Sequence, residues 1–236
     1  MRKSSVIVAQ VLDRLKDSVA PGVTTLDLEE IALRETRSRK AKPAFKGYKG
    51  YPYCLCTSVN DQVVHGMPSG RVLNEGDILS IDFGVCLDGF YGDSAVTVPV
   101  GNVSEDAARL IEVTAASLDA AIDRAWEGNH LSDISSAVQT SVELQGFSVV
   151  REFVGHGIGR ELHEPPQIPN FGLPGRGVKL RAGMVLAIEP MINRGGHAVR
   201  VLEDGWTAVT VDGSLSAHFE HTVAITAEGP YVLSRL

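Results

Sequence analysis

Apolar residues recur with helical spacing at the start of the chain. Five of them share one predicted helix face, at positions i, i+3, i+4, i+7 and i+11: Val8, Val11, Leu12, Leu15 and Val19. The Ala-Pro-Gly sequence at residues 20–22 ends this helix. Thr24, followed three residues later by Asp27, is a typical helix start, so we expect a second helix over residues 27–37.

Two β-strands joined by a tight turn are predicted after this helix pair. The segments 77–83 (DILSIDF) and 94–100 (SAVTVPV) are short, largely apolar and rich in residues that favour strands. Between them, Asp88-Gly89 is a dipeptide that favours a two-residue hairpin turn.

A similar order of elements begins again at Ser104. The apolar positions predict a helix over residues 104–126, which Gly128 separates from the next element. Another helix begins at Ser132-Asp133 and ends near Gly146. The segments 180–189 (LRAGMVLAIE) and 222–226 are predicted strands.

Two segments of the first half align with two segments of the second half. G-V-T-T-L-D-L from Gly22 matches G-N-H-L-S-D-I, which begins 106 residues later. L-N-E-G-D-I-L-S-I-D from Leu73 matches L-R-A-G-M-V-L-A-I-E, which begins 107 residues later. We therefore expect one α/β domain over residues 1–236, with pseudo-two-fold related halves at about 1–102 and 103–236. The alternative is a chance similarity between two amphipathic helix pairs.

This alignment also pairs four carboxylates. Asp82 and Glu189 end the matching strands, while Asp93 and Glu220 each precede the β-rich run that follows. A pseudo-two-fold axis would bring both pairs to one place, where four ionised acids would repel one another unless divalent cations bound between them. The alternative is that each acid is separately hydrogen-bonded or solvated.

Three histidines have a sequence context that suits chemistry. His156 lies between two glycines in V-G-H-G-I-G and could add a nitrogen ligand to a site of oxygens, which suits Co, Mn, Fe or Zn. His163 and His65 could each hydrogen-bond a substrate carbonyl or its tetrahedral adduct. The alternative for each of the three is a structural histidine.

Five motifs occur in order along the chain. They are V-N-D-Q-V-V-H-G-M-P, D-I-L-S-I-D-F-G-V-C-L-D-G-F-Y-G-D, G-H-G-I-G-R-E-L-H-E-P-P, V-L-A-I-E-P and H-F-E-H-T-V-A-I. Over essentially the whole chain, the sequence resembles the type I methionine aminopeptidases. This resemblance implies the pita-bread α/β fold, which contains an internal duplication. It also implies a metalloaminopeptidase that co-translationally removes the N-terminal methionine of nascent proteins and prefers a small, uncharged second residue.

The same resemblance implies roles for individual residues. Two divalent metal ions (Co, Mn, Fe or Zn) would be held by Asp82, Asp93, His156, Glu189 and Glu220, of which Asp93 and Glu220 would bridge both ions. Glu189 would also handle the proton of the attacking water, and His163 and His65 would contact the scissile amide. The residues implied for the methionine pocket are Tyr48, Tyr51, Cys56 and Trp206. At Phe45 the family often has a smaller or different residue, so the size of this pocket is open.

Composition and the absence of targeting signals indicate where the protein works and what it does not bind. The net charge of −7 argues against general nucleic-acid coating, and three cysteines do not form a disulfide framework. The amphipathic N-terminus is not a signal peptide and no run of 18 apolar residues occurs, so we expect a cytoplasmic protein without membrane contact. We expect no extension before the first helix, and the resemblance implies a monomer.

Seven of the 16 residues from Arg34 to Lys49 are basic. This segment could contact ribosomal RNA transiently near the peptide exit, or it could be a solvated loop, which the net charge of −7 favours. Two other functions remain as alternatives. Proline-specific relatives on the same fold usually carry an extra N-terminal domain, and non-catalytic binding modules typically lose metal ligands, whereas all five are present here.

Overall fold

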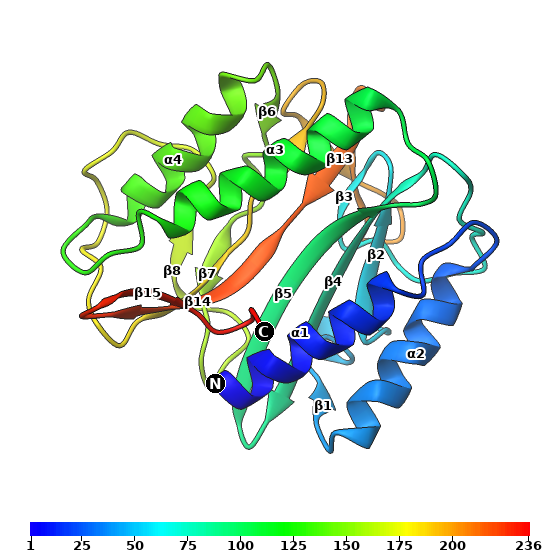
Figure 1. Ribbon diagram of the computed structural model, residues 1–236, viewed down its shortest axis with the longest axis horizontal. Coiled ribbons are helices and arrows are strands. Elements are labelled where there is room, and N and C mark those ends of the chain that lie inside the picture. Colours follow the sequence, from blue (N-terminus) through cyan, green and yellow to red (C-terminus); the bar gives the residue numbers. More distant parts are fainter.

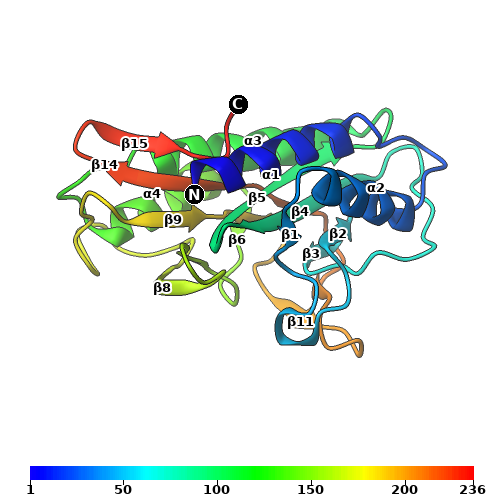
Figure 2. The ribbon, with the colours of Figure 1, turned by 90° about the horizontal axis from the view of Figure 1, so that it is seen from below.

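The computed structural model describes residues 1–236, with the helices on one face of a large antiparallel sheet (Figures 1 and 2). The four helices are α1 (Arg2–Lys16), α2 (Thr25–Ser38), α3 (Glu105–Ile122) and α4 (Leu131–Glu143). A short 3-10 turn, η1, covers Tyr48–Gly50. None of the helices is both long enough and apolar enough to cross a membrane.

Nine strands form the main sheet, in the order β1-β4-β5-β14-β9-β7-β8, with β2 also paired to β4 and β15 to β14. Their bounds are β1 (Lys42–Pro43), β2 (Leu55–Val59), β4 (Ile78–Leu87), β5 (Phe90–Pro99), β7 (Gly155–Gly157), β8 (Glu164–Ile168), β9 (Val185–Ile188), β14 (Glu220–Thr226) and β15 (Gly229–Val232). Two three-stranded sheets flank it. They contain β3 (Gln62–Val64), β6 (Ser148–Val149), β10 (Met191–Asn193), β11 (Val199–Val201), β12 (Ala208–Thr210) and β13 (Ser216–His218).

The predicted start of the second helix is confirmed as a reciprocal capping box. The side chain of Thr24 accepts the backbone N–H of Asp27 at 3.2 Å, and the Asp27 carboxylate accepts the backbone N–H of Thr24 at 2.7 Å. The predicted apolar face of α1 is buried at Val8, Val11, Leu12 and Leu15. The predicted third helix is too long, because α3 ends at Ile122 and is followed by turns.

Strand boundaries differ from the predictions in two places that affect the candidate site. Asp82 does not end a strand but lies inside β4, which continues to the hairpin turn at Asp88 and Gly89. Both turn residues have positive φ angles, 52° and 76°, as the predicted two-residue turn requires. The strand predicted over 180–189 covers only Val185–Ile188, because a turn with Gly183 at φ 96° precedes it.

Two large apolar clusters lie between the helices and the sheet. One has 15 buried residues, all between Val8 and Val100. The other has 21, which come from residues 107–225 together with Ile78. Each cluster joins one helix pair to its own strands, and the change from one to the other falls where β5 leads into α3.

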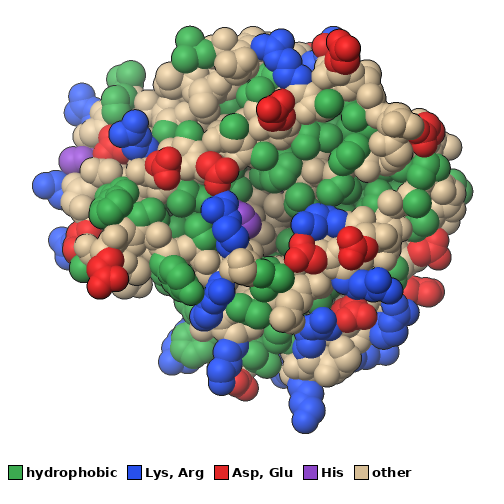
Figure 3. Space-filling view, viewed as in Figure 1, with side chains coloured by type: hydrophobic (Ala, Val, Ile, Leu, Met, Phe, Trp, Pro, Cys, Tyr) green, Lys and Arg blue, Asp and Glu red, His purple; other side chains and the backbone are tan.

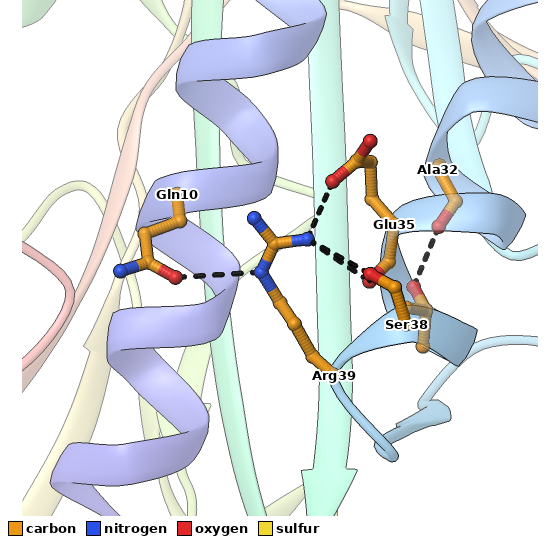
Figure 4. A network of polar contacts seen from close by, with 6 residues as sticks. Gln10, Ala32, Glu35, Ser38 and Arg39 are labelled. Atoms are coloured by element: carbon orange, nitrogen blue, oxygen red, sulfur yellow. Dashed lines mark hydrogen bonds and ion pairs between the residues drawn. The ribbon is translucent and has the colours of Figure 1, made fainter.

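Polar contacts join the first two helices at the surface. Arg39, directly after α2, donates to the side chain of Gln10 in α1 at 3.3 Å and to the Glu35 carboxylate at 2.5 Å (Figure 4). Figure 3 views the helix-bearing face, which is hollowed between α1 and α3 into a groove of about 290 Å³. The predicted metal ligands lie on the other face of the sheet.

Candidate active site

Strand alternation places the predicted acidic ligands on one face of the sheet. In the β4–β5 hairpin, Asp82 pairs with Ala95, and Asp93 pairs with Gly84, two residues beyond Asp82. Glu220 of β14 also pairs with Ala95. In a sheet, the side chains of directly paired residues point to the same face, and so do those of residues two positions apart on one strand. These three carboxylates therefore point to the same side.

The remaining two predicted ligands reach this side from neighbouring strands. His156 of β7 pairs with Ala187 of β9, and Glu189 follows Ala187 by two residues. The register therefore brings together side chains that are as far apart in sequence as Asp82 and Glu220. A slip of one residue in any of these strands would turn its ligand toward the helices.

All eleven predicted site residues line one cavity of about 170 Å³. Besides the five predicted ligands, the lining includes His65, His163 and the four residues of the predicted methionine pocket, Tyr48, Tyr51, Cys56 and Trp206. Phe45, Lys49 and Leu162 complete it. The structure thus places a carboxylate cluster beside an aromatic pocket.

Three of the predicted ligands form a compact group that could hold a metal ion. One ligand atom from each of Asp93, His156 and Glu220 lies within 4.8 Å of the others, and all three side chains are buried. Asp82 and Glu189 line the same cavity outside this tightest group. Glu189 is nevertheless close, with its Oε1 3.6 Å from Nε2 of His156.

Hydrogen bonding fixes which nitrogen of His156 faces this group. Nδ1 lies 2.8 Å from the carbonyl oxygen of Gly157, which can only accept, so Nδ1 carries the proton and Nε2 keeps its lone pair. Burial lowers the pKa of His156, which keeps the ring neutral. A lone pair that faces carboxylate oxygens is the arrangement expected for a metal ligand.

The carboxylates themselves lack partners. Oδ1 of Asp82, Oδ1 of Asp93 and Oε1 of Glu220 are buried without a hydrogen bond. Burial raises the pKa of Asp82, Glu189 and Glu220 well above the usual range, and burial raises the pKa of Asp93 to about 7. Because divalent cations would satisfy these oxygens and remove the repulsion, the donor set fits the metal ions implied by the sequence.

Hydrogen bonds and ring contacts position the aromatic residues on the apolar side of the cavity. The hydroxyl of Tyr51 donates to the backbone carbonyls of Leu55 (3.1 Å) and Gly66 (3.3 Å), and its ring contacts Trp206 edge-on at a centroid distance of 5.0 Å. Phe45 is 8% exposed and lines the cavity, so its ring helps to set the pocket size.

The two histidines predicted to contact the substrate lie at the rim of the metal group. His163 stacks on Tyr48 with centroids 5.1 Å apart, and its Nδ1 lies 2.9 Å from the Tyr48 hydroxyl. His65 has a φ of 60° and packs edge-on against Phe153 at 5.4 Å. Burial lowers the pKa of His65 to about 4 and is also the main cause that lowers the pKa of His163, so both rings are neutral near pH 7.

Sequence reasoning missed three residues near this site. Lys49 and Leu162 line the cavity, and Nε2 of His218 lies 3.5 Å from Oε2 of Glu189. The signal for His218 was present, since it precedes Glu220 by two residues and so could share its side of the chain. Nothing in the sequence near Lys49 or Leu162 distinguished them from ordinary surface and core residues.

Comparisons with known proteins identify the family of the chain. Residues 1–227 match the profile of metallopeptidase family M24. The chain is 55% identical over 234 residues to a methionine aminopeptidase from Clostridium perfringens, covering 99% of this chain and 94% of that protein. It is 52% identical to methionine aminopeptidase 1 from Bacillus subtilis, covering 100% of this chain and 95% of the relative.

Solved structures of known proteins share the fold of this chain. The methionine aminopeptidase of Thermotoga maritima superposes with a TM-score of 0.99 at 51% identity, covering 100% of this chain and 95% of that one. A prolidase from Pyrococcus furiosus shares the fold, with a TM-score of 0.81 at 20% identity over 63% of its length. The expected pita-bread α/β fold with its curled antiparallel sheet is therefore confirmed, as is the expected metalloaminopeptidase. With this agreement in sequence and in fold, the chain belongs to metallopeptidase family M24, among its methionine aminopeptidases.

Proposed function

We propose that this enzyme hydrolyses the peptide bond after an N-terminal methionine, with two divalent metal ions and with a preference for a small, uncharged second residue. The observation that carries the proposal is a single cavity in which unpartnered carboxylates and His156 lie beside a pocket of Tyr51, Cys56 and Trp206. An unbranched thioether suits a small aromatic pocket of this kind.

The two ions would be held by the five predicted ligands, with Asp93 and Glu220 shared between them. When bound, such ions lower the pKa of water and polarise a carbonyl group. The remaining steps fall to the protein's own groups. Glu189, which borders the ligand group, would accept the proton of the attacking water.

His163 and His65 would act on the amide itself. When the Tyr48 hydroxyl donates to Nδ1 of His163, the neutral ring keeps its proton on Nε2 and can donate to the oxygen of the scissile carbonyl. His65, which lines the same cavity, would orient the amide nitrogen. Both assignments follow from neutral rings, which can supply a hydrogen bond without adding positive charge beside the cations.

The substrate side chain would point away from the ligand group. Tyr51 and Trp206 form the walls of its pocket, and Phe45 limits its size. In that pose the α-amine lies at the carboxylates, which explains a requirement for a free chain end. The second residue then lies next to the ligand group, where a large side chain would collide with it.

An assay on three peptides tests the proposal. Metal-depleted protein is incubated with Met-Ala-x, Met-Lys-x and Ala-Pro-x, with and without added Co²⁺ or Mn²⁺. We expect metal-dependent release of methionine from Met-Ala-x alone. Release from Ala-Pro-x instead would assign a proline-specific activity, and no release at any metal concentration would contradict the proposed catalysis.

We further propose that the natural substrates are nascent chains in the cytoplasm and that the enzyme works as a monomer without membrane association or stable nucleic-acid binding. The basic segment from Arg34 to Lys49 bears on this setting. Figure 3 shows Lys and Arg side chains gathered over α2. Arg39 is held by Glu35 and Gln10, whereas Arg37, Lys42 and Lys46 are exposed. These exposed residues fit a solvated surface whose contact with the ribosome is at most transient.

A further inference from the structure

The carboxylate of Glu189 lies between two imidazole rings. Its Oε1 is 3.6 Å from Nε2 of His156, and its Oε2 is 3.5 Å from Nε2 of His218. Because Nδ1 of His156 donates to a carbonyl, the His156 atom that faces Glu189 has no proton to give. Of the two rings, only His218 can therefore hold this carboxylate with a hydrogen bond.

The backbone of His218 is fixed by a buried hydroxyl. Its N–H donates to Oγ1 of Thr97 at 2.8 Å, and its carbonyl accepts from the same oxygen at 2.9 Å. Thr97 is in turn 2.8 Å from the hydroxyl of Ser80 on β4. The strand that carries His218, β13, also pairs with β10, where His218 lies opposite Met191. The ring thus projects from a backbone that is tied to the main sheet and to β10.

The ring nitrogen near Glu189 has no competing partner. His218 is 1% exposed, and its Nε2 is buried without a hydrogen bond. A buried polar group without a hydrogen-bond partner lowers the stability of a protein. A small approach of Nε2 to Oε2 of Glu189, from the present 3.5 Å, would give it a partner. The neutral and the protonated ring can both carry a proton on Nε2, so the contact does not depend on a charge.

We propose that His218 is a positioning residue, which donates from Nε2 to Oε2 of Glu189 and thereby keeps Oε1 directed toward His156 and the ligand group. This inference rests on the proposed function, because it deepens the role of Glu189 there. Without the donor the carboxylate could rotate, since the side-chain hydrogen bond that Glu189 accepts, from Asn170, goes to its backbone carbonyl and not to the carboxylate. A carboxylate that must be oriented on each turnover would bind metal more weakly and accept a proton more slowly.

The test compares two variants of similar size and shape. His218→Gln keeps an N–H donor, whereas His218→Met removes it. Titration calorimetry of the metal-depleted proteins with Mn²⁺ measures metal affinity without any turnover. We expect His218→Gln to stay within about threefold of the unmodified protein and His218→Met to bind metal about 10–100-fold more weakly, the usual effect of losing a hydrogen bond to a metal ligand.

Kinetics supply a second readout. With saturating Mn²⁺, His218→Met is expected to lower kcat for Met-Ala-Ala while KM changes little, because the donor acts on Glu189 rather than on the substrate. If His218→Gln and His218→Met give the same metal affinity, whether normal or reduced, the hydrogen bond is not what matters and the proposal is wrong. If the unmodified enzyme releases no methionine, the proposed function fails, while the affinity comparison still decides the role of His218.

A measurement on the unmodified protein covers the case in which His218→Met does not fold. Two-bond ¹H–¹⁵N correlation spectra of the ¹⁵N-labelled imidazoles distinguish the two neutral tautomers. We expect the proton of His218 on Nε2 and that of His156 on Nδ1. A proton found only on Nδ1 of His218 would overturn the proposal.

Discussion

Thr222 and Asp93 exchange two buried hydrogen bonds across β14 and β5. The backbone N–H of Asp93 donates to Oγ1 of Thr222 at 3.0 Å, and that hydroxyl donates to the Asp93 carbonyl at 2.6 Å. One side chain therefore satisfies both backbone groups of a predicted bridging ligand from a strand far away in sequence. The same contact joins the strand that carries Asp93 to the strand that carries Glu220.

Thr222→Val should consequently destabilise the protein despite its nearly equal volume. It leaves a buried N–H and a buried C=O unsatisfied, which costs about 1–3 kcal/mol for each group. Urea unfolding of the metal-free protein measures the loss. Thr222→Ser, which keeps the hydroxyl, serves as the control, and equal stability of the two variants would contradict the assignment.

Metal removal should make stability depend on pH in a defined direction. Burial raises the pKa of Asp93 to about 7 and raises the pKa of Asp82, Glu189 and Glu220, so the folded metal-free protein holds more protons than the unfolded chain above about pH 4. By linkage, these four groups lower the free energy of unfolding as the pH rises through that window. Bound divalent ions remove the effect because they keep the carboxylates ionised.

Buried histidines act in the opposite direction and must be separated from this effect. Burial lowers the pKa of His65 and His221 to about 4 and that of His218 to about 3, so they add stability as the pH rises toward about 6.5. The effect of the carboxylates appears in the difference in Tm between metal-loaded and metal-free protein, because the ions would act directly on those four groups. This difference should grow from pH 5 to pH 8. A constant or shrinking difference would show that the acids are not buried as described.

Phe45 should restrict the first residue of the substrate. It lines the cavity next to the pocket formed by Tyr51, Cys56 and Trp206. Phe45→Ala should raise the rate for a peptide with N-terminal ethionine relative to that with methionine by about tenfold, because one extra methylene is worth about 1–3 kcal/mol in such a pocket. The ratio of kcat/KM values is the readout, so a partial loss of folded enzyme does not affect it. An unchanged ratio would place Phe45 outside the pocket.

Gly92 should tolerate no side chain, because β5 and α1 approach closely there. A Cβ atom at Gly92 would lie 2.7 Å from the backbone nitrogen of Ser5 and 2.9 Å from its Cα. Gly92→Ala should lower the free energy of unfolding by about 1–3 kcal/mol, as overpacking usually does. Gly70→Ala is the matched control, since its Cβ would meet nothing within 4 Å. Urea unfolding of both variants checks the difference.

The basic segment should contribute little to ribosome association. Arg37, Lys42 and Lys46 are exposed on a protein with a net charge of −7. Reversal of these three charges is expected to leave co-sedimentation with ribosomes unchanged between about 50 and 200 mM salt. A loss of association in the variant, together with a steep salt dependence in the unmodified protein, would instead support contact with ribosomal RNA.

Local patterns predicted the elements that depend on local interactions. The capping box at Thr24 and the turn at Asp88-Gly89 were predicted because each needs only neighbouring residues. The three-residue strands, such as β7 and β10, were not, because their pairing depends on partners far away in the chain. The internal duplication stays a prediction, although a helix pair precedes each group of strands.

The sequence predicted which residues line the candidate site, but not which contacts they make there. The alignment of the two halves pointed to the four carboxylates, sequence context to the three histidines, and motif resemblance to the four residues of the methionine pocket. The structure places all eleven on one cavity, and their individual roles stay predictions. The two-residue spacing to Glu220 indicated the side of the chain for His218, but the contacts of His218 and Thr222 follow from the register of β13 and β14 against other strands. A sequence records which side chains share a strand face, whereas strand pairing decides which of them meet.

The division of the predicted metal ligands between distant strands also limits when activity can arise during synthesis. Asp82 and Asp93 belong to the hairpin of β4 and β5, whereas His156, Glu189 and Glu220 come from β7, the end of β9 and β14. A ribosome-bound chain that has emerged only as far as β9 lacks the Glu220 carboxylate and the strand that joins β5 to β9. Hydrolytic competence therefore cannot arise before β14 has been synthesised, so a shorter nascent peptidase remains inert.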